Sequence, residues 1–189
     1  MRLSKTFSNS SVRIFLNWCS VFLIASFTMA ASCSSSKDLV VGTKTGNLAP
    51  EILCDGVEGS CVPLSSLKGS YVLIEFWAST CNQCRKDHFE MERMYYEYKD
   101  VKFINGMGFD IYSIALDESK NDWLESLKND RMSWDHQFCD TRKWNADAAI
   151  NYGVNNIPKY FLIDGDGVIV ERHININELE DILSSYKSR

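Results

Sequence analysis

Two cysteines separated by two residues, Cys81 and Cys84, are the residues in this sequence best suited to covalent chemistry. They directly follow a continuous apolar run, residues 71–78, and they open a stretch with helical periodicity. A thiol at the start of a helix meets unsatisfied N–H groups and the positive end of the helix dipole, which favour the thiolate. The two-residue spacer lets both sulfurs meet across the first turn. The first cysteine can then attack a disulfide, and the second, more shielded one can release the product.

Zinc sites and structural disulfides use the same Cys-x-x-Cys spacing, so the motif alone leaves these alternatives open. The strand–turn–helix context favours the redox role. A four-cysteine zinc site from Cys54, Cys61, Cys81 and Cys84 is the weaker alternative, and we expect no metal and no other cofactor. His88, His136 and His173 show no ligand spacing and are expected at the surface or as caps rather than in catalysis.

The segments around this motif predict an α/β fold, because strands alternate with helices. Residues 71–78 and 109–116 are continuous apolar runs that suit buried central strands. Further strands are predicted at 134–139, 158–163 and 168–171, and helices at 64–69, 82–99, 120–129, 142–152 and 177–187. The apolar faces of the second and third helices are predicted to contain Phe89, Met91, Met94, Tyr95, Tyr98, Trp123, Leu124 and Leu127. The turn at 164–167 joins the last two strands into an antiparallel hairpin.

A second hairpin is predicted near the start of this region, from short apolar runs at 51–54 and 60–63 around a five-residue loop. Cys54 and Cys61 would face each other across it, at a separation that permits a structural disulfide. Two buried thiols without a bond and a second redox-active pair are the alternatives. Cys139 ends a short strand and is expected to be an inert core thiol.

The first 32 residues have the layout of a bacterial export signal. Residues 1–13 are basic and Ser-rich, residues 14–31 are mostly apolar, and small residues stand directly before Cys33. This edge resembles a lipoprotein box, in which Cys33 would carry a lipid, although Ala30 stands where leucine is usual. Simple cleavage after Ala30 or Ala31 and an uncleaved anchor are the alternatives, and all three export the domain. We predict a signal at 1–32, a tether at 33–45 and a domain at 46–189.

Composition sets the class of protein. The chain has 189 residues, 45% hydrophobic and 24% charged, with a formal net charge of −5. These values fit one globular domain and exclude a collagen, a coiled coil or a disordered acidic chain. The excess of acidic residues also argues against nucleic acid as a partner. Five cysteines remain after Cys33 in an oxidising compartment, so at least one is unpaired or pairs transiently with another protein.

Two separated segments resemble signatures of the thioredoxin superfamily. Residues 76–84, Phe-Trp-Ala-Ser-Thr-Cys-Asn-Gln-Cys, resemble its Phe-Trp-Ala-x-Trp-Cys-x-x-Cys signature, and residues 157–167 resemble the second signature, where a cis-proline faces the disulfide. The leading Ala-Pro-Glu and Leu-Ser-Ser-Leu-Lys-Gly segments resemble the exported TlpA-like thiol:disulfide interchange proteins. The resemblance runs from Gly46 to the C-terminus. It implies a thioredoxin-like three-layer α/β/α sandwich with a mixed sheet and an added N-terminal β-hairpin.

The resemblance also implies roles for the residues around the two signatures. Cys81 would be the nucleophile and Cys84 the resolving thiol. Pro158 would be the cis-proline, and the backbone of Ile157 would hydrogen-bond an extended substrate. Trp77 would shield the site and contact substrate.

Two acids are candidates for moving the proton of the resolving thiol. Glu75 occupies the position where thioredoxins place a buried acid, and burial is expected to raise its pKa, so that it exchanges a proton with Cys84. Asp87 matches the acid that TlpA-like proteins carry three residues after the second cysteine. An acid that simply reaches the surface is the alternative for Glu75, and an ordinary acid in the first turn of a helix is the alternative for Asp87.

Three departures from the superfamily pattern bear on function. Thr80 replaces the tryptophan before the nucleophile, Phe89 stands where a helix-kinking proline is common, and the spacer Asn82-Gln83 contains neither proline nor histidine. The spacer tunes the redox potential, and without histidine it favours a reductant.

The predicted function is therefore that of a membrane-tethered thiol:disulfide oxidoreductase in the bacterial cell envelope. It would reduce cysteine-containing exported client proteins and be recharged by a membrane or periplasmic electron donor. A thiol peroxidase and a copper-handling or binding lipoprotein are the alternatives, although the Pro-x-x-x-Thr-x-x-Cys and Cys-x-x-x-Cys motifs usual for them do not occur in this sequence.

Overall fold

A six-stranded mixed sheet forms the centre of the domain. The computed structural model describes residues 39–53, 58–59 and 61–189. The strands follow the order β1-β6-β5-β2-β7-β8, and β3 and β4 form a separate two-stranded ladder. The strands are β1 (Glu58–Gly59), β2 (Tyr71–Trp77), β3 (Lys102–Phe103), β4 (Gly106–Met107), β5 (Phe109–Ala115), β6 (His136–Cys139), β7 (Lys159–Ile163) and β8 (Ile169–Glu171). The predicted central strands, β2 and β5, lie side by side and parallel, and β2 pairs antiparallel with β7 on its other side.

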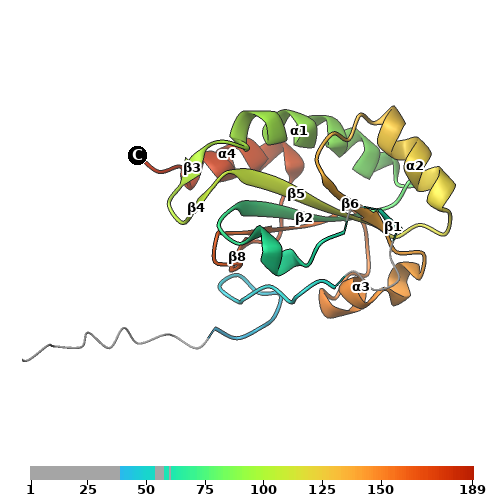
Figure 1. The fold of residues 1–189 in the computed structure, drawn as a ribbon, viewed down its shortest axis with the longest axis horizontal. Helices are drawn as coiled ribbons and strands as arrows, with labels where there is room; N and C mark the ends of the chain where they lie inside the picture. The colour runs from blue at the N-terminus through green and yellow to red at the C-terminus, as the bar shows by residue number, and fades with distance from the viewer. Residues whose placement is uncertain (1–38, 54–57, 60) are drawn as a thin grey trace, which may run out of the picture. The chain divides into compact units, whose positions relative to one another are not determined.

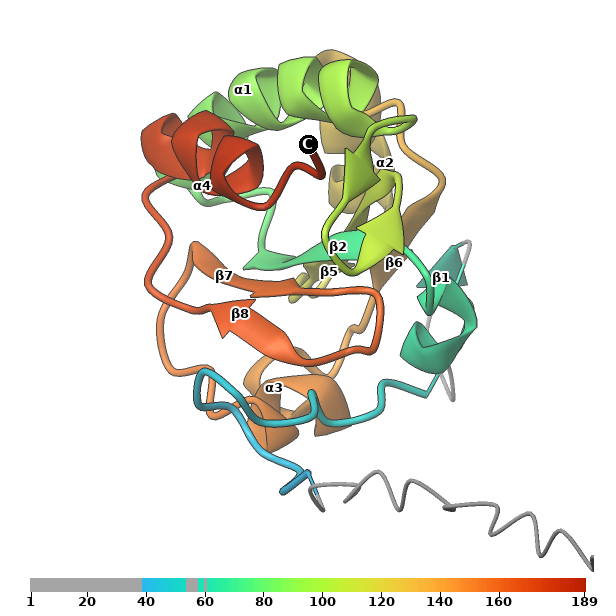
Figure 2. The ribbon, with the colours of Figure 1, turned by 90° about the vertical axis from the view of Figure 1, so that its left-hand side faces the viewer.

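Helices cover both faces of this sheet, as Figures 1 and 2 show. They are α1 (Asn82–Tyr98), α2 (Lys120–Asn129), α3 (Asp147–Asn151) and α4 (Leu179–Ser185), with short 3₁₀ turns η1 (Leu64–Leu67), η2 (Lys143–Asn145) and η3 (Ile176–Glu178). α1, α2 and α4 lie on one face and α3 on the other, with a hydrophobic core between the sheet and each helical layer. Every residue of β2 is buried, because it lies in the middle of the sheet between both cores. The predicted three-layer thioredoxin-like sandwich is confirmed.

Two residues assigned to buried helix faces are in fact exposed. Phe89 is 70% exposed and Leu124 is 45% exposed. On α1 the inward face is taken by residues on neighbouring turns that include Cys84, Asp87 and His88. Phe89 follows His88 by one helical step of about 100° and therefore turns towards solvent. A polar face, rather than the most apolar one, packs against the sheet near the cysteines.

The N-terminal region also differs from the prediction. Residues 51–53 and 61–63 are not strands. Among the described residues between 51 and 63, the strand is β1, which lies in the predicted loop and pairs antiparallel with β6. Pro63, at the end of the second predicted strand, lacks the N–H group that a hairpin ladder there would need. Residues 40–48, partly assigned to the tether, form a loop in which Gly46 N–H donates to the Ile169 carbonyl at 2.8 Å.

The predicted helix at 142–152 is interrupted, since η2 and α3 are separated by Ala146 in an extended conformation. The β3–β4 ladder and the short strand β1 are elements that no apolar pattern indicated. Within the part of the chain that the structure describes, no helix has the length and apolar character needed to cross a membrane.

Candidate active site

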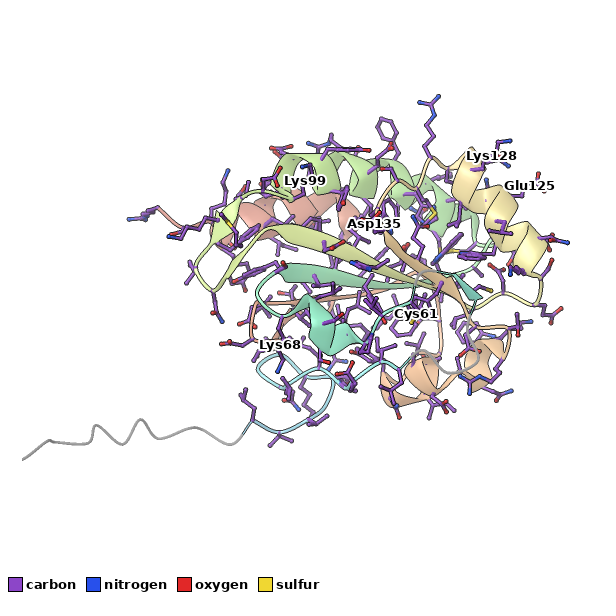
Figure 3. The ribbon with its side chains drawn as sticks, in the orientation of Figure 1. Cys61, Lys68, Lys99, Glu125, Lys128 and Asp135 are labelled. Atoms are coloured by element: carbon purple, nitrogen blue, oxygen red, sulfur yellow. A yellow bond between two sulfur atoms is a disulfide. The ribbon has the colours of Figure 1, made fainter. Side chains whose placement is uncertain are left out.

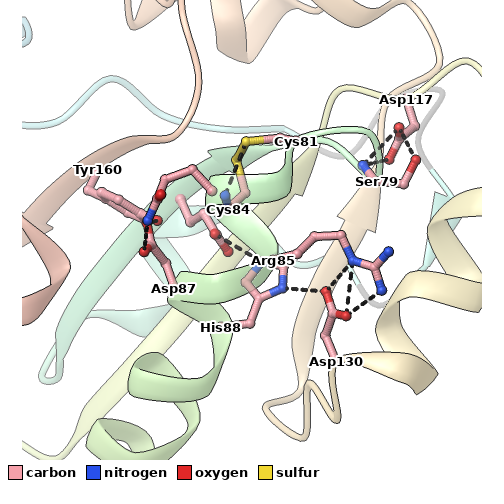
Figure 4. Close-up of a disulfide and its surroundings, with 11 residues drawn as sticks. Ser79, Cys81, Cys84, Arg85, Asp87, His88, Asp117, Asp130 and Tyr160 are labelled. Atoms are coloured by element: carbon pink, nitrogen blue, oxygen red, sulfur yellow. Dashed lines mark hydrogen bonds and ion pairs between the residues drawn. A yellow bond between two sulfur atoms is a disulfide. The ribbon is translucent and has the colours of Figure 1, made fainter.

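The two cysteines of the motif form a disulfide at the start of α1. Cys81 and Cys84 are bonded, and Cys81 is the N-cap residue of the helix (Figure 4). The backbone N–H of Cys84 donates to Cys81 Sγ at 3.1 Å, so one of the unsatisfied donors of the helix end points at this sulfur. Cys81 is partly exposed, whereas Cys84 is fully buried. After reduction, the helix end would stabilise a thiolate on the accessible cysteine.

The second signature lies beside the first. The Ile157–Pro158 peptide bond is cis. Pro158 lines a groove together with Gln83, which stands between the two cysteines, and Ile157 packs against the same core as Cys81. The structure therefore brings together the Cys-x-x-Cys segment and the cis-proline segment. In the sequence, 73 positions separate Cys84 from Ile157.

Asp117 fixes the loop that leads into the motif. Its carboxylate accepts hydrogen bonds from the backbone N–H of Ser79 at 3.0 Å and from Ser79 Oγ at 2.8 Å. Asp117 follows β5, and Ser79 follows the neighbouring strand β2. This pair holds the turn between β2 and α1 in place just before Cys81.

Glu75 is fully buried in the middle of β2, so its predicted burial is confirmed. Its carboxylate is not isolated. Ser113 Oγ donates to Oε2 at 2.6 Å, and Ser113 in turn accepts a hydrogen bond from Trp134 Nε1 at 3.0 Å. The other oxygen, Oε1, lies 3.2 Å from His88 Nε2. A buried carboxylate with these partners is satisfied on both oxygens.

His88 is one of several site residues that the sequence analysis missed, together with Arg85, Asp117, Asp130 and Tyr160. We expected His88 at the surface, and it is fully buried. Its two ring nitrogens lie between two carboxylates, with Nδ1 at 2.9 Å from Asp130 Oδ2. Arg85 completes the chain, donating to Asp130 from Nε and Nη2 (Figure 4). The spacing held a signal, since His88 is four residues after Cys84 and such residues share a helix face.

The charges in this series of hydrogen-bonded side chains favour a protonated His88. Burial alone would lower its pKa, but the charge of Glu75 and the hydrogen bonds to Glu75 and Asp130 outweigh burial and raise the pKa of His88. Burial likewise opposes ionisation of Asp130, yet Arg85 and His88 lower the pKa of this carboxyl. Two acids and two bases thus form one group whose charges cancel when all are ionised.

Trp77 supports the site from inside the fold. It is fully buried, and its ring packs edge-on against His88 with centroids 4.6 Å apart. The prediction that Trp77 contacts substrate is corrected, because no part of this side chain is at the surface. It shields the buried charges beneath the disulfide instead.

Asp87 connects α1 to the strand that follows the cis-proline. It is 7% exposed; Oδ1 accepts from Gln83 Nε2 at 2.7 Å, and Oδ2 accepts from the Tyr160 hydroxyl at 2.8 Å. Burial and the charges of Glu75 and Asp87 raise the pKa of Tyr160, so its hydroxyl remains a donor. Tyr160 is directly opposite Glu75 in the β2–β7 register. The two acids therefore lie on either side of one buried tyrosine.

The remaining predicted residues stand apart from this centre. Cys33 and Cys54 lie outside the described residues, so the lipid and the Cys54–Cys61 bond stay predictions. Cys61 packs against the core on the α3 side of the sheet, with Sγ 3.6 Å from the Tyr112 hydroxyl (Figure 3). Cys139 is a buried thiol, as expected, 3.9 Å from the Asp117 carbonyl. Within the described ranges, no three His, Cys, Asp or Glu side chains are grouped as metal ligands.

Replacing His88 by glutamine should lower the free energy of unfolding by about 3–5 kcal/mol at neutral pH, because two buried carboxylates lose their shared cation. The raised pKa of His88 determines how this loss of stability changes with pH. Its contribution is fully present below the pKa of an unfolded histidine and is lost as pH rises through the higher, folded pKa. The difference in the free energy of unfolding between the variant and the wild type should therefore become smaller in alkaline solution. Urea unfolding across pH measures it.

His136 provides the matched control for this variant. It also pairs with an acid, Asp110, at 3.2 Å, but both side chains are partly exposed. His136→Gln should cost at most about 1 kcal/mol. If both variants lose the same free energy of unfolding, the buried charged group stabilises the fold no more than an ordinary surface pair does.

Comparison with known proteins agrees with this site. The Redoxin family model matches residues 44–187. The thiol-disulfide oxidoreductase ResA of Bacillus anthracis is 31% identical over 137 residues, which cover 72% of this chain and 73% of that protein. The thioredoxin-like protein YneN of Bacillus subtilis is 28% identical over 137 residues, covering 71% and 74%.

Solved structures give the same result. The thioredoxin domain of a thiol-disulfide oxidoreductase from Bacteroides vulgatus superposes with a TM-score of 0.60 at 27% identity, covering 74% of this chain and 98% of that one. A thiol:disulfide interchange protein from Bacteroides sp. superposes with a TM-score of 0.60 at 28% identity, covering 77% and 91%. The chain therefore belongs to the Redoxin family, among its TlpA-like thiol:disulfide interchange proteins.

Proposed function

We propose that this thiol:disulfide oxidoreductase is exported, is held at a membrane of the cell envelope by a lipid on Cys33, and reduces disulfides in exported client proteins. The observation that carries the activity is the Cys81–Cys84 pair. One sulfur is partly exposed and accepts a helix N-terminal N–H at 3.1 Å, while its partner is fully buried beside it. This difference in access supports attack by Cys81 and resolution by Cys84.

The reaction is a two-electron exchange. The Cys81 thiolate attacks one sulfur of the client disulfide, and the other client sulfur leaves as a thiolate that takes up a proton. Cys84 then loses its proton and attacks Cys81 Sγ, forming the Cys81–Cys84 bond and releasing the second client thiolate. The client gains two electrons and the protein loses them. A membrane or periplasmic dithiol donor would restore the reduced form.

The cis-proline and its neighbours would present the client to Cys81. An extended segment can hydrogen-bond the backbone at Ile157 and continue along the groove that Pro158 and Gln83 line. Asp117 and Ser79 hold the motif loop still during the exchange. These contacts would orient the incoming client sulfur towards Cys81.

The dithiol form should reduce insulin disulfides, which turbidity measures, and its reduction potential decides the direction of the cellular reaction. The spacer Asn82-Gln83 has no histidine to stabilise a thiolate further, so a potential well below that of strong oxidants is expected. A value near about −120 mV would identify an oxidant and overturn the proposed direction.

The anchor predicts a change in location. Cys33→Ala removes the thiol that would carry the lipid, so the mature protein should move from the membrane fraction to the soluble fraction of the envelope. Fractionation and immunoblotting of cells expressing wild type and variant measure this. A cleaved Cys33→Ala protein that stays with membranes would contradict lipid anchoring.

A further inference from the structure

A groove with a volume of about 500 Å³ is lined by residues of both signature segments, Gln83 of the Cys-x-x-Cys motif and the cis-proline Pro158. Gln83 and Asp87 of α1 form one wall, the cis-proline segment forms another, and the loop after β8, residues 172–176, closes it. Gln83 belongs to the first turn of α1, whose N-cap is Cys81, so an occupant of this groove would lie at the same helix end as the disulfide. The groove is thus placed to read the sequence around a client cysteine.

Arg172 is the unusual residue of this groove. Its Nε atom is buried, and among the described residues it has no hydrogen-bond partner. No carboxylate of those residues lies within ion-pair distance of its guanidinium. By contrast Arg85, Arg93 and Arg142 all pair with acids. The Nη1 and Nη2 atoms of Arg172 are not among the buried polar atoms without a partner, so these terminal N–H groups, rather than Nε, are the donors that a carboxylate in the groove could reach.

The other charged residues of the groove leave Arg172 available. The carboxylate of Asp87 is engaged by Gln83 and by the Tyr160 hydroxyl. The ammonium group of Lys159 lies over the Phe161 ring, 5.8 Å from its centroid. Asn156 and Asn175 add neutral amide groups to the lining. The local chemistry therefore favours a carboxylate, although the whole chain has a formal net charge of −5.

We propose that this groove selects client segments with an aspartate or glutamate close to the reacting cysteine, and that Arg172 is its specificity-determining residue. The inference rests on the proposed reductase activity. The planar guanidinium offers paired N–H donors that match the two oxygens of a carboxylate. This contact forms as the client binds Cys81, so it increases the rate of the first exchange for acidic clients.

Two synthetic peptides test this selectivity. They are identical except for Glu or Gln two residues from a single cysteine, and each is a mixed disulfide with 2-mercaptoethanol. The dithiol protein should react with the Glu peptide about tenfold faster, as second-order rate constants measured by stopped flow. Arg172→Gln should bring the ratio of the two constants to about one, and Arg172→Lys, which keeps the charge but not the planar fork, should give an intermediate ratio.

Arg131→Gln is the matched control. Arg131 is exposed and does not line the groove, and the substitution changes the net charge by the same amount. It should keep the preference for the Glu peptide. Equal rates for both peptides with the wild type, or a preference that survives Arg172→Gln, would overturn the role of Arg172. If the wild type reacts with neither peptide, it is the reductase activity itself that fails.

Discussion

The Cys81→Ser variant should lose disulfide reduction completely, down to the rate of the buffer alone. Cys81 is the partly exposed cysteine of the pair and receives the N–H of Cys84 at 3.1 Å. A serine hydroxyl has no thiolate form, and it cannot form a bond that is released by thiol exchange. Insulin reduction by the pre-reduced variant measures the loss. Wild-type turnover in Cys81→Ser would remove the proposed mechanism.

The companion variant, Cys84→Ser, should behave differently. Cys81 can still attack a client disulfide, but the buried position next to it no longer supplies a resolving thiol. The reaction should stop at a covalent adduct between Cys81 and the client, visible as a mass shift under non-reducing conditions and reversed by dithiothreitol. An adduct with Cys84→Ser and none with Cys81→Ser separates attack from resolution. An adduct on neither variant would contradict the order of the two steps.

Glu75→Gln should slow the resolving step about 100-fold, within the range of general base catalysis. Cys84 is fully buried, and its proton must leave before its sulfur can attack. Glu75 lies in the strand below, with one oxygen 3.2 Å from His88 and the other 2.6 Å from Ser113. Glutamine keeps the shape and can hydrogen-bond, but it cannot carry the proton. Single-turnover decay of the mixed disulfide, followed across pH, measures this step.

Two further variants make the test specific. Asp87→Asn removes the competing acid, which lies beside the groove and holds Tyr160. Ser113→Ala removes a hydrogen bond from Glu75 but keeps its carboxylate, so it should slow resolution far less than Glu75→Gln. If Glu75→Gln resolves at the wild-type rate at every pH while Asp87→Asn is slow, Asp87 is the proton acceptor.

The surroundings of Glu75 also decide how its replacement changes the stability of the fold. Removing an isolated buried charge would stabilise a protein. Glu75 instead faces His88, whose other nitrogen contacts Asp130. Glu75→Gln leaves this buried imidazolium with one carboxylate fewer, so the free energy of unfolding should fall. The structure thus links the acid proposed for proton transfer to the stability of the fold.

The sequence by itself determined the chemistry and the order of the elements. An apolar strand, a Cys-x-x-Cys motif and a helix follow one another directly, so local geometry alone places a thiol at a helix N-terminus. The β2 and β5 strands were predictable because both faces are buried and the apolar runs are continuous. The helix α2 was predicted with the bounds that it has, since Ser119 caps it and its pattern is local.

Only the tertiary structure decided which residues surround the two sulfurs. His88 and Phe89 are adjacent in the sequence, and one helical step of about 100° buries the histidine and exposes the phenylalanine. Asp130 reaches His88 because α2 ends beside α1, and Tyr160 reaches Asp87 because β7 pairs with β2 in one register. Such contacts join residues far apart along the chain. No local pattern encodes them, because they depend on how the packed helices and strands are rotated and aligned.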